Sequence, residues 1–537
     1  MSGIDRWILA LVVFVPLTGA LLTLFLPRRP RDIRWFALIV SLLTFLLSLH
    51  LPVYFNHGQA GFQYEIDAPW ISSPNIHFHL GVDGISMWLV VLTTFLTPLC
   101  VLISWKSIHE REKEFFALLL LLETAILGVF LALDLFLFYF FWEFSLIPMA
   151  LLIGMYGHDR RIYAAVKFFL YTMVGSVFML AALIYLYAQT GSFQFAEIQS
   201  ALLAGRIGGS ALGWLFLGFF VAFAVKVPVF PLHTWLPDAH VEAPTAGSVL
   251  LAGVLLKMGT YGMIRFNLGF FPEQSRHHAP WIMALALIGI IYGALVALVQ
   301  PNMKKLIAYS SVSHLGFVVL GIFSFTQAGL TGAVYVMLAH GISTGALFML
   351  AGIIYDRRHT YEIREYGGLA TIMPRYATFF LVVTFASIGL PLLNGFVGEF
   401  LVLSGAFQAR PVYGVLGASA VIWSAGYMLW LYQRVFWGTV KNDANRSLPD
   451  MNAREQIALW PVTAAALVMG VAPLIWTAAI DPAVQPLANP APAVSIWIDK
   501  SPVEKTQLER FRSTVTVNGS PGVRSLAQSG VPNEVSR

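Results

Sequence analysis

Four ionisable side chains stand inside long apolar stretches of the sequence: Glu143, Lys226, Lys257 and Glu399. A charge at the centre of a membrane costs about 2.5–3.5 kcal/mol on insertion scales, so these four together would cost on the order of 10 kcal/mol if they faced lipid. We therefore expect them to face one another or water. Burial disfavours a charged lysine and a nearby carboxylate favours it, so a lysine with a movable carboxylate partner can take up and release a proton. The residue types thus predict proton transfer.

Four further polar groups stand in similar apolar stretches: Glu123, Lys167, His314 and His340. Glu123 falls in the middle of its stretch, which favours a part in a proton path. Lys167 lies about one helical turn from Arg161 and could instead extend its charge to the membrane surface. The two histidines could carry protons or could be hydrogen-bonded packing groups. We treat these four residues as a secondary proton path.

Two of the apolar stretches contain helix-breaking residues. These are Pro228, Pro231, Pro391 and Gly395. Proline removes a helical hydrogen bond, and unwound backbone is tolerated at membrane depth only where it is buried in protein or lines a wet cavity. The first break follows Lys226 directly, so it can solvate the ammonium group and admit water. For Asp238, His240 and Glu242, which follow this break, we expect structural roles as a cap and as loop contacts.

The sequence argues against a metal or a bound cofactor in this chain. The single cysteine, Cys100, excludes an internal disulfide, a CxxC redox pair and a four-cysteine iron–sulfur site. Neither GxGxxG nor GxxxxGK[ST] is present, so no nucleotide-binding motif is found. His77 and His79 are a weak metal signal, because no third ligand accompanies them.

The composition is that of a membrane protein with many spans. Of 537 residues, 58% are hydrophobic and 11% are charged, whereas soluble domains carry roughly 25% charged residues. A helix needs about 20 apolar residues to cross a bilayer, and the N-terminal stretch is interpreted as a retained first helix because it lacks a cleavage pattern. We expect about fourteen transmembrane helices, near residues 4–26, 33–55, 82–104, 115–133, 134–153, 164–188, 209–231, 246–267, 280–299, 303–323, 329–354, 375–405, 411–437 and 456–480.

The predicted domains are an all-α array with an internal repeat. Three N-terminal helices (1–113) precede a first five-helix group (114–268) and a second, inverted five-helix group (279–438). A last helix (455–480) and an extramembrane tail (481–537) follow. We expect this tail to be poorly ordered. Each group contains its break in the fourth helix, an arrangement typical of transporters with inverted repeats. The alternative is that proline and glycine are simply commoner in membrane helices.

Basic residues predict the orientation. If the first loop is cytoplasmic, most loop lysines and arginines fall on that side, and the exceptions are Arg206, Arg265, Arg276 and Arg410. This asymmetry follows the positive-inside rule. Both termini are then expected on the outer, periplasmic side.

Several of these stretches resemble the antiporter-like subunits of respiratory complex I. The resemblance lies in AVKVPVFPLHTWLPDAHVEAPT, KKLIAYSSVSHLG, LDLFLFYFFWEFSLIPM and GLPLLNGFVGEF, and it covers residues 1–480. The stretch LGVDGISMWLVVLTTFLTPLC and the glutamate at position 399 are similar to those of subunit M (chain 4) of the bacterial NADH–quinone oxidoreductase.

This resemblance implies a proton-pumping module of a membrane arm in a bacterial inner (cytoplasmic) membrane. Glu143 would be the partner of Lys226, Lys257 the central relay and Glu399 the exit-side carrier. NADH, FMN, iron–sulfur clusters and quinone would belong to partner subunits, with neighbours resembling subunits L and N, and no nucleic acid would be bound. Two alternatives stay open: a D-type subunit of a multisubunit Na⁺/H⁺ antiporter, and a membrane scaffold whose buried charges serve only assembly.

Overall fold

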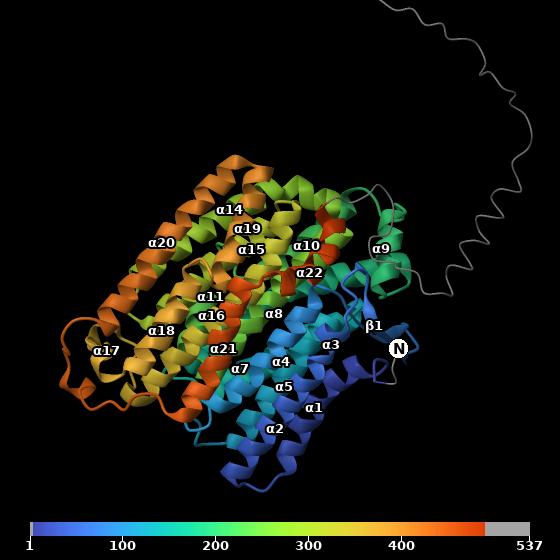
Figure 1. The fold of residues 1–537 in the computed structure, drawn as a ribbon. Coiled ribbons are helices and arrows are strands. Elements are labelled where there is room, and N and C mark those ends of the chain that lie inside the picture. Colours follow the sequence, from blue (N-terminus) through green and yellow to red (C-terminus); the bar gives the residue numbers. More distant parts are fainter. Residues whose placement is uncertain (1–3, 489–537) are drawn as a thin grey trace, which may run out of the picture. The chain divides into compact units, whose positions relative to one another are not determined.

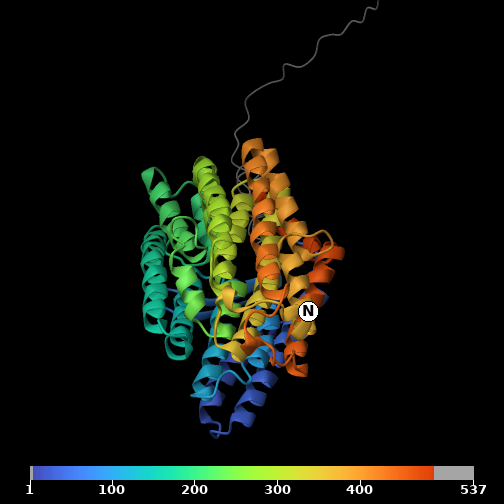
Figure 2. The same cartoon turned by 90° about the vertical axis from the view of Figure 1, so that its left-hand side faces the viewer.

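The computed structural model describes residues 4–488, and this part of the chain is almost entirely helical. Figure 1 shows long helices lying side by side. In Figure 2, the yellow-green helix α14 (Pro272–Leu298) lies between the green helices of the first half and the orange helix α20 (Pro411–Phe436). The other long helices are α1 (Ile8–Phe25), α2 (Pro30–Ser48), α4 (Ser86–Ile103), α5 (Glu112–Leu131), α8 (Arg161–Thr190), α15 (Met303–Ile322), α16 (Gln327–Arg358) and α21 (Ala453–Val471).

Eleven of the helical segments in residues 4–488 are long and apolar enough to cross a membrane, and the bent pair of α21 and α22 (Leu474–Ala488) makes up to twelve. Three of these segments consist of consecutive helices, namely α2 with α3 (His50–Tyr54), α6 (Leu135–Phe144) with α7 (Leu146–Tyr156), and the segment Thr245–Leu268 that is described below. The expectation of an all-α membrane protein with many spans is thereby confirmed. The count of fourteen and the inverted repeat stay predictions.

Both predicted breaks interrupt their helices. Helix α10 (Ser210–Lys226) ends at Lys226, and helix α11 (Trp235–Glu242) starts only after an irregular segment that contains Pro228 and Pro231. Helix α18 (Pro374–Ser387) is separated from α19 (Asn394–Ala409) by residues 388–393, which include Pro391. Gly395 lies inside α19 rather than in the break, and a Cβ atom there would meet the Ala386 carbonyl oxygen at 2.2 Å. This glycine therefore allows α19 to approach the end of α18.

A β-hairpin that the sequence analysis did not predict lies between α3 and α4. Strands β1 (Gln63–Ile71) and β2 (Ile76–Val82) pair in antiparallel fashion. His77 contacts Asp67 at 2.6 Å, and His79 contacts Gln194 at 2.6 Å and Glu65 at 3.1 Å. Burial lowers the pKa of His79, but its hydrogen bonds and the charges of Glu65 and Asp67 outweigh this effect and raise it. The His79 ring thus joins the hairpin to the helical body through Gln194, whereas the His77 ring bonds within the hairpin.

The C-terminal part of the helical body differs from the prediction. Helix α22 continues to Ala488, so residues 481–488, which were expected to begin a poorly ordered tail, are helical. Asp481 accepts a hydrogen bond from Thr331, and its carbonyl oxygen accepts one from Gln327. These contacts hold the start of the expected tail against α16. The rest of that tail, residues 489–537, lies outside the part of the chain that the structure describes.

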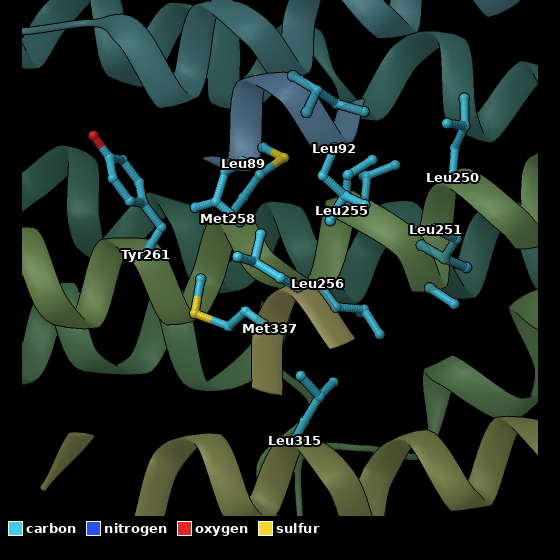
Figure 3. Packing of buried hydrophobic residues seen from close by; sticks show 14 of the residues in the cluster. Leu89, Leu92, Leu250, Leu251, Leu255, Leu256, Met258, Tyr261, Leu315 and Met337 are labelled. Carbon is cyan, nitrogen blue, oxygen red and sulfur yellow. The ribbon is translucent and has the colours of Figure 1, made fainter. Parts of the chain in front are cut away.

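The segment Thr245–Leu268 is fully buried and irregular in its helical winding. It consists of α12 (Thr245–Leu250), the π-helix η1 (Leu251–Leu255), α13 (Leu256–Gly262) and the π-helix η2 (Met263–Leu268). Figure 3 shows its side chains packed among Leu89 of α4, Leu315 of α15 and Met337 of α16. Because this segment crosses the apolar core, any charge on it is far from bulk water.

Arg265 belongs to this buried segment, although the sequence analysis counted it among the basic residues of outer loops. It is 2% exposed and forms an ion pair with Asp83, which is fully buried at the start of α4. The remaining short elements are α9 (Phe195–Leu203), α17 (Leu369–Ile372) and the 3-10 helices Ile363–Glu365 and Asp443–Asn445.

Candidate functional site

Lys257 lies at the centre of the buried polar groups. It is 0% exposed, and its Nζ atom donates to the carbonyl oxygen of Ala252 and contacts Nδ1 of His340 at 2.7 Å. Ala252 belongs to η1, and π-helical turns of this kind are frequent at functional sites because they displace backbone groups from the α-helical pattern. Here the altered winding supplies a carbonyl to a buried ammonium group.

Gly341 allows α16 to approach η1 closely enough for this contact, and Gly253 of η1 leaves room for Leu96 of α4. A Cβ atom on Gly341 would meet the carbonyl oxygen of Gly253 at 2.8 Å, and a Cβ atom on Gly253 would lie 2.6 Å from Leu96. His340 is the neighbour of Gly341 in α16, so the close packing of these backbones brings its ring to Lys257.

His314 and Glu399 continue the polar chain from His340. The rings of His340 and His314 have centroids 5.7 Å apart, and Nδ1 of His314 lies 2.9 Å from Oε1 of Glu399. The other ring nitrogen of His314 lies 3.4 Å from the hydroxyl of Tyr427. Glu399 and His314 are each 6% exposed, so this pair is shielded from solvent. We call Lys257, His340, His314 and Glu399 the polar axis.

The second helix break lies directly beside Glu399. Gly389 has a backbone φ of +74°, and a Cβ atom there would be 3.1 Å from Oε2 of Glu399. Such a conformation favours glycine. The break therefore brings unwound backbone next to the carboxylate at the end of the polar axis, and Asn394 at the start of α19 donates to the carbonyl oxygen of Ala339, next to His340.

Lys226 and Glu143 lie close together without forming an ion pair. Lys226 is 1% exposed, and its Nζ atom lies 5.2 Å from the ring centroid of Trp142 and 5.7 Å from that of Phe168. Nζ has no hydrogen-bond partner within residues 4–488. Glu143 lies beside Tyr139 and Ser176 and interacts electrostatically with Lys226. The two groups that the sequence predicts as partners thus interact electrostatically, and Nζ of Lys226 packs against aromatic rings.

Lys257 and Lys226 stand on neighbouring helices. Gly259 of α13 packs against the end of α10, since a Cβ atom there would lie 2.7 Å from Val227 and 2.9 Å from the carbonyl oxygen of Phe223. This close packing brings the first helix break, which begins after Lys226, against the helix that carries Lys257.

The remaining secondary candidates lie apart from the polar axis. Glu123 of α5 is 0% exposed and lies beside Thr97 of α4. Lys167 of α8 forms an ion pair of 2.6 Å with Asp238 of α11. Lys167 therefore ties α8 to α11, and Asp238 lies inside α11 as the partner in this ion pair rather than as a cap or a loop contact.

Two buried histidines lie near the first break: His233, which the sequence analysis did not name, and His240, for which it expected only a structural role. His233 is 3% exposed and packs against Phe230 and Tyr292, and His240 is 0% exposed and stacks on Phe348 with ring centroids 4.4 Å apart. None of their four ring nitrogens has a hydrogen-bond partner among residues 4–488. The signal that could have found them is their position after a break, where a titratable ring has access to unwound backbone.

Comparison with known proteins identifies the family. A family model described as NADH:quinone oxidoreductase/Mrp antiporter, TM, matches residues 132–423, and the model for the amino terminus of NADH-ubiquinone oxidoreductase chain 4 matches residues 11–130. NADH-quinone oxidoreductase subunit M of Rhodobacter capsulatus is 46% identical over 496 residues, which cover 90% of this chain and 96% of the relative. The chain belongs to the chain 4 (subunit M) family of NADH–quinone oxidoreductase.

Solved structures agree with this assignment. A chain of respiratory complex I from Thermus thermophilus is 35% identical, with a TM-score of 0.82 over 89% of this chain and 99% of that chain. The Mrp complex from Dietzia sp. DQ12-45-1b aligns with a TM-score of 0.79 at 20% identity, over 92% of this chain and 100% of that chain, which shows a common fold alone. The comparisons therefore favour the chain 4 family over the antiporter alternative.

Proposed function

We propose that this chain translocates protons across the membrane as a membrane-arm subunit of an NADH–quinone oxidoreductase. The observation that carries the proposal is the polar axis, in which Lys257 contacts His340 and His314 contacts Glu399, all of them buried. Each member can gain or lose a proton, and neighbouring members are close enough for transfer directly or through one water molecule. A scaffold would bury these groups at a cost without using them.

The energy for pumping comes from partner subunits in this proposal. Moving one positive charge outward against about 150 mV costs roughly 3.5 kcal/mol, from about 2.3 kcal/mol per 100 mV. The sequence carries no nucleotide or iron–sulfur motif that could supply this energy. NADH oxidation and quinone reduction, with their FMN and iron–sulfur clusters, therefore belong to partners, and coupling reaches this chain through charges of antiporter-like neighbours resembling subunits L and N.

The order of the groups suggests a path. Lys226 and Glu143 respond to the neighbouring charge, Lys257 relays the proton at the centre, and Glu399 releases it beside the second break. Such close groups titrate as a coupled set rather than singly. The proposed setting is a bacterial inner membrane with both termini on the outer side.

The decisive experiment replaces the two ends of the polar axis. We expect Lys257→Met and Glu399→Gln each to lower proton pumping by roughly a hundredfold, the lower end of what a positioned acid or base contributes. NADH–quinone turnover should fall together with proton pumping. In a coupled complex, electron transfer from NADH to quinone cannot proceed when proton translocation is blocked. The measurement is turnover and pumping in membrane vesicles that contain equal amounts of assembled complex.

The matched control is Lys441→Met, since Lys441 is an exposed lysine outside the long helices. It should leave both rates unchanged. Normal pumping in fully assembled Lys257→Met and Glu399→Gln complexes would contradict the proposed function.

A further inference from the structure

Asp83 and Arg265 form a buried ion pair outside the polar axis. The side chains of Arg265 and Asp83 are 2% and 0% exposed. The carboxylate oxygen that accepts from Arg265, Oδ1 of Asp83, also accepts from the backbone of the chain at the start of α4. These further donors are the N–H groups of Ile85 at 3.0 Å and Ser86 at 2.9 Å. The backbone thus fixes the carboxylate, and Arg265 is bound to a rigid point.

Aromatic side chains enclose the guanidinium group of Arg265. Its Cζ atom lies 4.9 Å from the ring centroid of Tyr261 and 5.2 Å from that of Phe62, within the range of cation–π attraction. The hydroxyl of Tyr261 donates to the carbonyl oxygen of Phe130 in α5 at 3.1 Å. Arg265 and the residue one turn before it are therefore held by α4, by α5 and by the residue that precedes the hairpin.

Lys257 lies on the same continuous segment, about two turns before Arg265. Lys257 and Tyr261 belong to α13, and Arg265 belongs to η2, which follows α13 directly. Residues four apart are neighbours on a helix surface, and the contact of Tyr261 with Arg265 shows that the two successive turns are packed in this way. A rotation of the segment at Arg265 about its axis is therefore transmitted to Lys257.

The winding on both sides of α13 decides where the Lys257 side chain points. Both η1 and η2 are π-helical, with hydrogen bonds between residues five apart instead of four. Each π-turn accommodates an extra residue. If η2 relaxed to α-helical winding, α13 would rotate relative to Asp83 by roughly 100°, one residue's share of a 3.6-residue turn. Lys257 would then point away from His340, which it contacts in this structure.

Stability alone does not explain a buried ion pair at this place. Taking two charges out of water is costly, and replacement of a buried pair by apolar residues is often neutral or stabilising. The best-attested use of such buried polar groups is to specify one register over its alternatives. The π-turn η2 needs a contact of this kind, because its sequence MIRFNL is also compatible with an ordinary α-helix.

We infer that Asp83 and Arg265 are positioning residues for Lys257. The ion pair holds α13 at the rotation where Nζ of Lys257 meets the carbonyl oxygen of Ala252 and Nδ1 of His340. This inference rests on the proposed function and adds what keeps the central group of the polar axis in place. In this role neither Asp83 nor Arg265 takes up or releases a proton, and both act through geometry alone.

The test separates positioning from stability by relating every rate to the amount of assembled complex. The double variant Asp83→Asn/Arg265→Gln removes both charges, and the new amide oxygen can still accept from the backbone at the start of α4. We expect its NADH–quinone turnover per assembled complex to fall roughly tenfold, since a misplacement of about 1 Å can cost up to a hundredfold. Arg265→Lys keeps the buried charges paired, so it should assemble and turn over faster than the double variant.

The matched control is Arg34→Gln. Arg34 forms an ion pair of 2.7 Å with Glu112, the two side chains are 16% and 8% exposed, and their helices α2 and α5 carry no member of the polar axis. This variant should lower at most the amount of assembled complex and leave turnover per complex unchanged. Normal turnover per complex in every Asp83 and Arg265 variant that assembles would overturn the inference.

Combination with Lys257→Met gives a second readout that a merely structural role would not produce. Adding Asp83→Asn/Arg265→Gln to Lys257→Met should slow turnover no further, because the pair then has no lysine to position. Losses that multiply would overturn the inference, since the pair would then act elsewhere. If Lys257→Met itself pumps normally, the proposed function fails. If Lys257→Met loses pumping while the double variant turns over normally, only the positioning role is wrong.

Discussion

At the scale of single residues, the buried ionisable groups make two kinds of contact. Lys257 with His340 and His314 with Glu399 are hydrogen-bonded pairs, whereas Lys226 and Glu143 interact electrostatically and form no ion pair. A buried charge without a partner is costly, and the rings of Trp142 and Phe168 offset part of this cost by cation–π attraction. A weakly held ammonium group can lose its proton when the local charge changes, as a switch requires.

Lys226 and Glu143 should therefore act as one unit in transport. We expect Glu143→Gln and Lys226→Ala each to lower coupled NADH–quinone turnover by roughly tenfold or more while the complex assembles, since each removes one half of an acid–base switch. The double variant should be no slower than the slower single variant. A double-mutant cycle on turnover in vesicles measures this coupling. Losses that simply multiply would show that the two residues act independently.

At the scale of elements, a single carboxylate joins helix α6 to the hairpin. Asp134 caps the N-terminus of α6 by accepting from the backbone N–H groups of Phe136 and Leu137 at 2.9 and 3.0 Å, and its other oxygen accepts from the N–H of His77 at 3.2 Å. The sequence marks Asp134 only as the boundary between two helices. Its contact with strand β2 shows that it also fixes the hairpin.

Loss of this cap should weaken the protein measurably. We expect Asp134→Ala to destabilise it by about 1–2 kcal/mol, the usual cost of removing a helix N-cap. Asp134→Asn should retain most of the stability because its amide oxygen still accepts. Thermal inactivation of the solubilised complex measures both. Asp443→Ala is the control, since the Asp443 side chain is 91% exposed in a surface ion pair with Arg446, and such pairs contribute little to stability. An equal loss of stability in Asp443→Ala and Asp134→Ala would contradict the role of the cap.

The helix breaks and most spans could be predicted from the sequence, because proline and apolar length act locally. The π-helical turns around Lys257 could not, since LLAGVLLKMG has the composition of an ordinary α-helix and only tertiary packing changes its winding. The contact of Lys257 with His340 depends on the register between two helices that are distant in the sequence. The hairpin was missed because its strands alternate only weakly.

At the scale of the whole molecule, the topology decides which side takes up protons. The basic loops predict that α16 begins on the outer side, and Arg276 at the start of α14 is among the few basic residues of outer loops. Helix α22 is tied to both positions: Asp481 bonds with Thr331 and Gln327 of α16, and Arg276 donates to the carbonyl oxygen of Ala488. These contacts hold α22 at the end that the basic loops predict to be the outer one.

Helix α22 is therefore not expected to return through the membrane. Its 15 residues span about 22 Å at 1.5 Å per residue, less than the roughly 30 Å of a hydrocarbon core. The axis of α22 is bent by 68° from that of α21. The chain therefore stays on the side of the membrane that α21 has reached. We expect a periplasm-dependent reporter fused after residue 488 to be active, and the same reporter fused after Arg446, in a predicted cytoplasmic loop, to be inactive. The reverse pattern would show that the number of crossings is wrong.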